Sequence, residues 1–243
     1  MNIIFAGALF FLFFAFNPDP GDFEKDVFNT SEGELVITFI GHGTLMMEFN
    51  GKVIHIDPVA RYADYTKMPK ADLILVTHQH GDHLDPGSIG ILNKESTEVV
   101  LSELCFNQYG KGKIMKNGDS GIYAGIKIDA VPAYNIKHTR GGGQPFHPKG
   151  EGNGYILHLG DKKVFVAGDT ENIPEMANLE DIDIAFLPMN VPYTMTPEMV
   201  ADAVKMFKPA ILYPYHFGNT NTDILLNLMK DQPETEVRIR KLK

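Results

Sequence analysis

The sequence predicts an α/β fold in which β-sheets pack on each other and helices lie outside. From Glu34 onward, the first half of the chain consists mainly of short segments typical of strands. The second half mixes such segments with stretches typical of amphipathic helices. A chain of 243 residues is long enough to enclose one large core and fits a single domain. Elements with one apolar face each are stable when they stack in layers.

The first half of the chain is expected to be rich in strands, at residues 34–40, 45–49, 50–57, 72–77, 97–102 and 126–133. Asn50-Gly51 is a strong signal for a tight hairpin, so the strands around it are expected to pair antiparallel. Residues 72–77 are almost continuously apolar, as expected of a strand buried on both faces. A helix is expected at residues 85–94, because Asp85 can cap its N-terminus and Pro86 can take its first position.

The second half is expected to mix strands and helices. Residues 154–169 form two strands joined at Gly160-Asp161, and further strands are expected at residues 183–189, 210–217 and 236–242. A helix is expected at residues 196–208, with Thr196 as its N-cap and apolar residues along one face. A second helix is expected at residues 221–231.

The composition limits the classes of function. The net charge is -9 and the isoelectric point is about 5.4, so nucleic acid is disfavoured as a partner because most of the surface repels a polyanion. Cys105 is the only cysteine, which excludes an intramolecular disulfide. Neither the composition nor any pattern indicates an oligomeric state.

The N-terminus carries an apolar run from Ile3 to Phe16, followed by the helix-breaking stretch NPDPGD. The run is short for a membrane-spanning helix but suits the apolar region of a signal peptide. We therefore expect residues 1–33 to be a signal or membrane tether with a linker, and residues 34–243 to be the functional domain. This expectation places the protein outside the cytoplasm, in the periplasm or on a membrane. A core element in a cytoplasmic protein is the alternative.

The sequence LILVTHQHGDHLDP, residues 73–86, places three histidines and two aspartates directly after a predicted buried strand. The spacings of two, two and one between His78, His80, Asp82 and His83 are too short for one helical face. Gly81 allows the loop to curl, so His78 and His80 can face one metal ion while Asp82 and His83 face a second. Imidazole and carboxylate ligands suit zinc, manganese or iron.

The motifs of the chain resemble those of the metallo-β-lactamase superfamily. The resemblance rests on three segments in order: THQHGDH, VFVAGDT and LYPYHFG. An earlier segment, FIGHGTLMMEFNGKVIHIDP, resembles the subgroup typified by ascorbate-6-phosphate lactonase and N-acyl phosphatidylethanolamine phospholipase D. The resemblance covers about residues 34–243. It implies an αββα four-layer sandwich that binds one or two metal ions between its two sheets.

The resemblance also implies metal ligands at matching positions. In the family pattern, two histidines bind the first metal ion, three side chains bind the second and one aspartate binds both. The first two positions correspond to His78 and His80, and the next three correspond to Asp82, His83 and His216. The bridging position corresponds to Asp169. A bridging carboxylate offsets the repulsion between two dications about 3.5–4 Å apart.

One expected ligand of the first metal ion is missing. Many relatives carry a histidine at or near the position of Asn135, and an amide oxygen is a weaker ligand for zinc than an imidazole. His138 and His147 are the candidate replacements, and His147 is favoured because Pro145 and Pro148 stiffen its loop. If neither histidine binds, the first site is incomplete and the protein holds one metal ion or a metal that tolerates oxygen ligands.

Three further residues are candidates for supporting roles. Asp57 is expected to accept a hydrogen bond from a ligand histidine and so fix its tautomer, although it could instead cap the turn at Pro58. His42 and Tyr193 are expected to line the pocket, with an ordinary loop residue and an ordinary core residue as the alternatives.

Residues 138–154 read HTRGGGQPFHPKGEGNG and are too long for a tight turn. Arg140, Lys149 and backbone amides in this loop could hold an anionic group of a small-molecule substrate. A flexible, solvated loop is the alternative.

These observations predict a metal-dependent hydrolase. One or two divalent ions, with zinc favoured over Mn²⁺ and Fe²⁺, would lower the pKa of water, and Asp82 or Asp169 would accept its proton. An ester, a lactone, a phosphodiester or an acyl-phospholipid-like molecule would be the substrate. The alternative is a metal-binding or di-iron redox module without hydrolytic activity.

Overall fold

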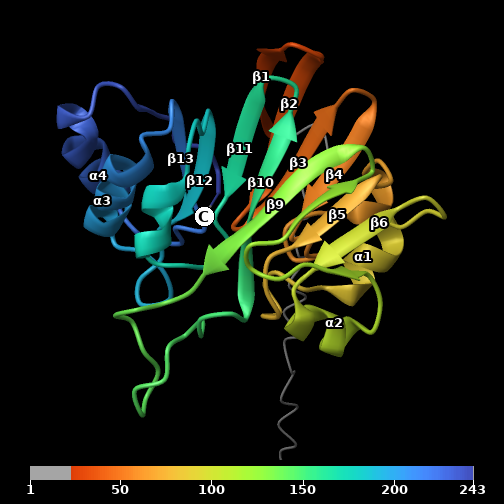
Figure 1. Ribbon diagram of the computed structural model, residues 1–243, viewed down its shortest axis with the longest axis horizontal. Coiled ribbons are helices and arrows are strands. Elements are labelled where there is room, and N and C mark those ends of the chain that lie inside the picture. Colours follow the sequence, from red (N-terminus) through yellow and green to blue (C-terminus); the bar gives the residue numbers. More distant parts are fainter. Residues whose placement is uncertain (1–22, 243) are drawn as a thin grey trace, which may run out of the picture.

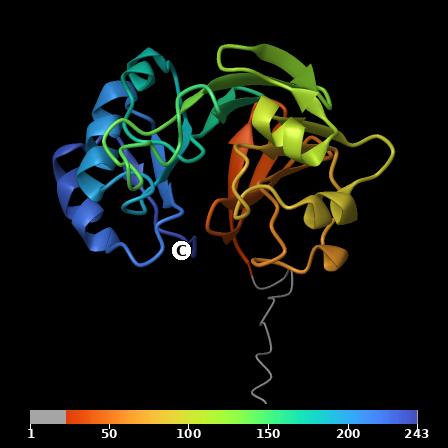
Figure 2. The same ribbon diagram turned by 90° about the horizontal axis from the view of Figure 1, so that it is seen from below.

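Two seven-stranded sheets face each other in the computed structural model, which describes residues 23–242. The first sheet has the strand order β1-β2-β3-β4-β5-β6-β7 and the second has the order β14-β13-β12-β11-β10-β9-β8. Helices α1 and α2 cover the outer face of the first sheet, and α3 and α4 cover that of the second (Figures 1 and 2). The chain therefore forms four layers in the order αββα, which confirms the predicted fold class.

The strands of the first sheet are β1 (Glu24–Thr30), β2 (Gly33–Gly41), β3 (Thr44–Phe49), β4 (Lys52–Ile56), β5 (Leu73–Val76), β6 (Glu98–Leu101) and β7 (Lys113–Ile114). The strands of the second sheet are β8 (Ser120–Tyr123), β9 (Ile126–Ala133), β10 (Gly152–Leu159), β11 (Lys162–Val166), β12 (Ile184–Pro188), β13 (Ile211–Tyr215) and β14 (Glu236–Val237). The α-helices are α1 (Pro86–Leu92), α2 (Glu103–Tyr109), α3 (Pro197–Phe207) and α4 (Thr222–Leu228). Short 3₁₀ helices are η2 (Tyr65–Lys67), η3 (Pro174–Asn178) and η4 (Met229–Asp231).

The turns and caps that the sequence predicted are present. Asn50 and Gly51 both have positive φ angles, of 47° and 69°, as a tight hairpin turn requires, and β3 pairs antiparallel with β4. The side chain of Asp85 accepts hydrogen bonds from the first backbone N–H groups of α1. Thr196 caps α3 in the same way through the N–H of Met199.

Two apolar cores hold the layers together. The larger core joins the inner faces of both sheets and continues between the second sheet and α3. The smaller core lies between the first sheet and helices α1 and α2. Strand β5 is buried along its whole length, because one of its faces contacts each core. The loop after β5 is therefore attached to a rigid element.

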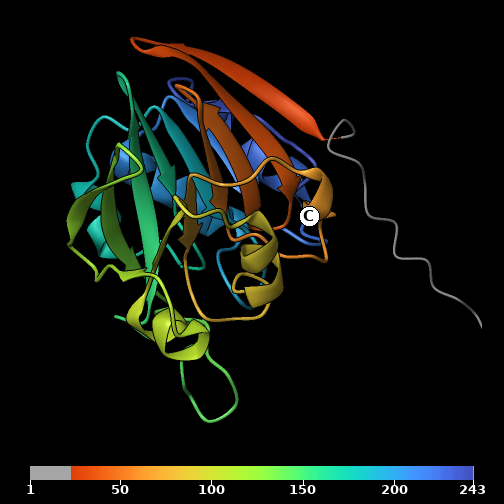
Figure 3. The same ribbon diagram turned by 90° about the vertical axis from the view of Figure 1, so that its right-hand side faces the viewer.

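The structure differs from the sequence prediction at both ends of the domain. Strand β1 pairs with β2 along its whole length, so the folded domain begins before Glu34 (Figure 3). The last strand is only Glu236–Val237, shorter than the predicted residues 236–242. Beyond it, the guanidinium group of Arg240 binds the carboxylate of Asp26 on β1 at 2.7 and 2.8 Å. This contact links β1, at the edge of the first sheet, to the segment that follows β14, at the edge of the second sheet.

The proposed signal or tether at the N-terminus lies outside the described residues. None of the helices within residues 23–242 has both the length and the apolar character needed to cross a membrane.

Candidate metal centre

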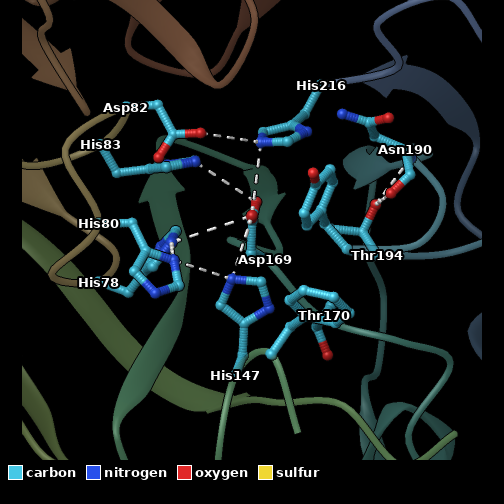
Figure 4. Close-up of polar contacts among 12 residues, drawn as sticks. His78, His80, Asp82, His83, His147, Asp169, Thr170, Asn190, Thr194 and His216 are labelled. Atoms are coloured by element: carbon cyan, nitrogen blue, oxygen red, sulfur yellow. Dashed lines mark hydrogen bonds and ion pairs between the residues drawn. The ribbon is translucent and has the colours of Figure 1, made fainter. Parts of the chain in front are cut away.

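Besides His42, which lies between β2 and β3, seven histidine and aspartate side chains converge at one edge of the sandwich, where several strands of both sheets end (Figure 4). They come from the loop after β5, the residue Asp169 after β11, His216 directly after β13, and the loop between β9 and β10. Buried strands fix the positions of these side chains more firmly than a surface loop alone would.

Close packing of the backbone at this edge requires glycine at two positions. A Cβ atom on Gly43 would lie 2.7 Å from Cε1 of His83. A Cβ atom on Gly168, which has a φ angle of 64°, would lie 2.8 Å from the carbonyl oxygen of Asn153. His42 and His216 also have positive φ angles, of 55° and 49°, which are uncommon for residues other than glycine. Such strained conformations concentrate at functional sites.

The first cluster of potential ligands consists of three imidazole nitrogens. Nε2 of His78 lies 3.1 Å from Nδ1 of His80, and Nε2 of His147 lies 3.2 Å from the same Nδ1 atom. One nitrogen from each ring lies within 4.8 Å of the other two. His78 and His147 are buried, and His80 faces the solvent in part. Three imidazoles in this arrangement could hold one metal ion.

The second cluster consists of Asp82, His83 and His216, joined by His42. Oδ2 of Asp82 lies 3.8 Å from Nε2 of His216 and 3.2 Å from Nε2 of His42. The rings of His42 and His216 have their centroids 3.6 Å apart. Although the sequence suggested His42 only as a pocket residue, the structure brings it within reach of this cluster.

Asp169 lies between the two clusters. Its Oδ2 atom is 3.3 Å from Nε2 of His147 in the first cluster and 3.4 Å from Nε2 of His216 in the second. Its Oδ1 atom is 3.5 Å from Nε2 of His83. A single carboxylate therefore reaches both clusters, as Figure 4 shows.

Several polar atoms that point into the centre have no hydrogen-bond partner. They are Nε2 of His83, Nε2 of His216 and Oδ1 of Asp169, and all three are buried. A buried polar atom without a partner is costly, so an array of such atoms indicates a binding site for a cation. Imidazole nitrogen together with carboxylate oxygen is a donor set that suits zinc, manganese or iron. The residues present therefore fit one or two divalent metal ions.

Residues behind the centre orient the histidine rings. Asp57 lies fully buried at the end of β4, and its Oδ2 atom is 2.7 Å from Nδ1 of His83. The hydroxyl of Thr77 donates to the same carboxylate at 2.6 Å and lies 3.1 Å from Nδ1 of His78. With Nδ1–H of both rings engaged in this way, each Nε2 presents its lone pair to the centre. The contact predicted between Asp57 and a candidate ligand is present, and Thr77 is an addition that its position beside His78 could have signalled.

Asn135 supports His147 and does not itself face the cluster. Its Oδ1 atom accepts hydrogen bonds from Nδ1 of His147 at 2.7 Å and from the backbone N–H of His147 at 2.9 Å. Its amide group donates to Glu171 at 3.1 Å and to the carbonyl of Tyr193 at 2.9 Å. The structure thus gives Asn135 a positioning contact with the histidine that occupies the third corner of the first cluster.

His138 is turned away from the first cluster, with its Nδ1 atom 2.9 Å from Oε1 of Glu171. Glu171 is fully buried and accepts backbone N–H groups from Ile136, Lys137 and His138 at 2.7–2.8 Å. Sequence reasoning missed Glu171, although it lies only two residues beyond Asp169.

The ionisation states of His78, His147 and Asp169 favour a bound cation, whereas that of His83 does not. Burial holds the pKa of His78 well below its ordinary value and lowers that of His147 to about 4, so both rings are neutral near pH 7. Burial also opposes a charge on His83, but the nearby carboxylates of Asp169 and Asp57 raise its pKa to about 9. Burial raises the pKa of the Asp169 carboxyl, but the surrounding histidines more than offset this effect and hold it below its usual range. An ionised Asp169 beside the neutral imidazoles of His78 and His147 attracts a metal ion, and an ion that binds His83 displaces the proton of that ring.

A cavity of about 520 Å³ opens onto the centre. The residues that line it are His42, His80, Asp82, Arg140, Phe146, His147, Asp169, Asn190, Tyr193 and His216. The expectation that His42 and Tyr193 line the pocket is therefore consistent with the structure, and Phe146 and Asn190 are additions. Lys149 is absent from this lining, and its ammonium group binds Glu175 at 2.6 Å.

The chain is similar to known proteins in sequence and in fold. A family model described as a beta-lactamase superfamily domain matches residues 36–216. A metal-dependent hydrolase of Pelotomaculum thermopropionicum is 31% identical over 193 residues, which cover 75% of this chain and 84% of the relative.

Two solved structures are also similar. One, from Parabacteroides distasonis and provisionally assigned as a metal-dependent hydrolase, is 51% identical and has a TM-score of 0.87. The alignment covers 91% of this chain and 100% of that chain. A metallo hydrolase from the archaeon Ignicoccus hospitalis has a TM-score of 0.67 at 23% identity, over 86% of this chain and 95% of that chain, and this likeness concerns the fold alone.

Proposed function

The chain belongs to the beta-lactamase superfamily and is a metal-dependent hydrolase, and on this premise we propose that it holds two zinc ions and cleaves an ester, lactone or phosphodiester bond in a small substrate. When bound, such ions supply Lewis acidity and lower the pKa of water toward about 7. The nitrogen-rich ligand set favours zinc over hard cations such as magnesium and calcium.

Each cluster would hold one metal ion. His78, His80 and His147 form the first binding site, and Asp82, His83 and His216 form the second. Asp169 contributes to both, and its negative charge offsets the repulsion between the two cations. His42 lies close enough to Asp82 to orient that carboxylate through their 3.2 Å contact.

The position of Asp169 carries this proposal. Its carboxylate lies 3.3–3.5 Å from nitrogens of His147, His83 and His216, which belong to both clusters. The buried atoms that lack partners point at the same space. An arrangement that served only to stabilise the fold would satisfy these atoms internally.

Asp82 and Asp169 are the groups that can accept the proton of the attacking water. Both line the cavity. Burial acts to raise the pKa of the Asp82 carboxyl, but its contacts with His216 and His42 hold that pKa below the usual range, so the group is ionised and its oxygens can accept a hydrogen bond from the attacking water. The side chain of Asp82 is 42% exposed, which gives it access to a substrate in the cavity.

The test combines metal analysis with a substrate panel. Protein purified without added metal is assayed for bound zinc, manganese and iron, and is then offered matched carboxylic esters, lactones and phosphodiesters. We expect about two zinc ions per chain and hydrolysis of at least one class. Both should be lost after treatment with a chelator and restored by zinc. Asp169→Asn should lose both, whereas His158→Ala, which removes a histidine outside the centre, should lose neither.

The alternative function is a redox module with a di-iron centre. It predicts two iron ions per chain, reduction of oxygen by the iron-loaded protein and no hydrolysis with any metal. That set of results would overturn the hydrolytic proposal.

We further propose that the N-terminal apolar run directs export or membrane tethering, because it combines the length of a signal peptide core with a Pro- and Gly-rich break behind it. Fractionation of cells that express the full chain tests this proposal. Intact protein found only in the cytosolic fraction would contradict it.

A further inference from the structure

We propose that Arg140 is the specificity-determining residue of the centre and binds an anionic oxygen of the substrate, from a carboxylate or a phosphate, at the rim of the cavity. This inference rests on the proposed hydrolytic function and names the substrate class: small anions that also carry an apolar group.

The backbone of Arg140 is fixed in place. Its N–H donates to the carbonyl of Gln144 at 2.7 Å, and its own carbonyl accepts the N–H of Gly143 at 3.1 Å. Thr139 and Pro145 form a bridge across the same turn. Although this segment belongs to the loop between β9 and β10 that extends past the strand ends in Figure 1, its turn presents Arg140 to the cavity in a defined position.

The charge of Arg140 lacks a partner of opposite sign. Among the residues that line the cavity it is the only lysine or arginine, and no carboxylate within residues 23–242 forms an ion pair with it. Its Nη2 atom donates to the neutral carbonyl of Phe146 at 3.2 Å, and its guanidinium group lies 5.6 Å from the centroid of the Phe146 ring. Lys149 on the same loop is different, because Glu175 neutralises it.

The contact between Arg140 and His80 depends on the tautomer of the histidine. Nη2 of Arg140 lies 3.0 Å from Nε2 of His80, whose Nδ1 atom faces the first cluster. A neutral ring that uses Nδ1 as a metal ligand carries its proton on Nε2. Two donors would then face each other, because arginine has no acceptor. An anionic oxygen that lies to one side of the pair, within reach of both nitrogens, could accept a hydrogen bond from each.

The rim beside Arg140 is apolar. Phe146 and Tyr193 pack with their ring centroids 5.0 Å apart in an edge-to-face arrangement. Both residues line the cavity, and Tyr193 is 46% exposed. The hydrogen bond from Asn135 to the carbonyl of Tyr193 joins the two segments that carry these residues. Exposed apolar groups beside a single cation suit an organic acid that has both an apolar part and an anionic part.

The first experiment measures zinc affinity by competition with a chelator, in the parent, in Arg140→Met and in the control Lys149→Met. If Arg140 serves the substrate, Arg140→Met should bind zinc as tightly as the parent or several-fold more tightly. The substitution removes a positive charge close to the metal site. It also removes an N–H donor that favours the His80 tautomer with its proton on Nδ1, and that tautomer cannot bind the metal ion through Nδ1. A loss of about tenfold or more would show that Arg140 supports the metal site instead, and would overturn the proposal.

The second experiment uses two 4-nitrophenyl esters of glutaric acid, one with a free remote carboxylate and one with that carboxylate methylated. Arg140→Met should lower kcat/KM for the anionic ester by about tenfold or more, mainly through KM, and leave the neutral ester within about twofold. Lys149→Met should change neither. Equal losses on both esters, or no loss on the anionic one, would overturn the proposal.

A binding measurement separates this inference from the proposed function. If the parent hydrolyses neither ester, calorimetry on the zinc-bound protein with 4-phenylbutyrate and its neutral amide tests Arg140 alone, independently of the reaction. We expect the parent to prefer the acid by about tenfold or more and Arg140→Met to lose that preference. A preference retained in Arg140→Met would place the anion on the metal ions and overturn the proposal.

Discussion

Oδ2 of Asp57 lies 2.7 Å from Nδ1 of His83, and through the hydroxyl of Thr77 the same carboxylate also reaches His78. His83 belongs to the second cluster and His78 to the first. One buried side chain on the first sheet thus fixes the ring orientation in both clusters. Because the contacts run through Nδ1, they leave both Nε2 atoms free for a metal ion.

Asp57→Asn should weaken metal binding at both sites by about 10–100-fold, because the neutral amide holds the two rings less firmly. Asparagine is the appropriate replacement, because Asp57 has a φ angle of 45°, which asparagine adopts more readily than most residues. Zinc titration against a competing chelator measures the effect. Asp129→Asn serves as the control, because it removes a carboxylate on β9 that does not belong to the metal centre. This variant should bind zinc as the parent does. An unchanged affinity in Asp57→Asn would show that the network does not support the ligands.

Asp169→Ala should lower the metal content at both sites, whereas His216→Ala should mainly empty the second site. The reason is that the carboxylate lies 3.3 Å from a nitrogen of the first cluster and 3.4 Å from one of the second, while His216 belongs to one cluster only. Elemental analysis after gel filtration gives the number of ions per chain. Full metal content in Asp169→Ala would exclude a bridging role.

Three variants of the loop between β9 and β10 should differ in a defined order. His147→Ala should lose metal at the first site, because it removes one of three ligand nitrogens. Asn135→Ala should weaken that site by about 10–100-fold, because it removes the acceptor for Nδ1 of His147. His138→Ala should bind metal as the parent does, since its ring contacts Glu171. Tight binding in His147→Ala together with loss in Asn135→Ala would mean that the amide, and not the imidazole, completes the site.

Local patterns were sufficient to predict most of the fold. The buried run of β5, the Asn50-Gly51 turn and the caps at Asp85 and Thr196 all depend on neighbours in the sequence, and the structure contains each of them. Strand β1 was missed because its side chains are only half-buried or exposed, so it lacks the apolar pattern of a core strand. It is held by its backbone pairing with β2 and by the contact of Asp26 with Arg240, which is distant in the sequence.

Helix α2 was also missed, although its signals are visible in hindsight. Ser102 caps its first turn, and Gly110 ends it with a φ angle of 77°. Seven residues between two strands are too few for a clear helical period, so the caps were the only evidence.

The residues of the candidate site also differ in how well the sequence predicts them. The loop from His78 to His83 could be predicted as a cluster because its residues are adjacent in sequence. The choice between Asn135, His138 and His147 could not be settled, because it depends on the path of a long loop. Glu171 fixes that path by accepting three backbone N–H groups, and a single buried glutamate gives no such signal in the sequence.

A histidine outside the metal centre should make stability depend on pH. His55 on β4 is fully buried, its Nε2 atom donates to the carbonyl of Pro69 at 3.1 Å, and its Nδ1 atom has no hydrogen-bond partner. Burial lowers its pKa to about 4, whereas the ordinary value is 6.5. The unfolded chain therefore binds a proton between pH 6.5 and pH 4 that the folded protein does not, so the free energy of unfolding falls as the pH falls through this window.

His55→Gln should remove this part of the pH dependence, because glutamine can still donate to Pro69 but does not titrate. Between pH 7 and pH 5, the parent should lose about 2 kcal/mol more unfolding free energy than His55→Gln. Urea denaturation in the presence of a chelator measures the difference, since metal release then contributes to neither protein. Above pH 7 the ring is neutral in both the folded and the unfolded chain, so the two proteins should show parallel pH profiles there, which serves as the control. Parallel profiles below pH 6.5 as well would show that the folded protein accommodates a charged His55, contrary to its buried surroundings.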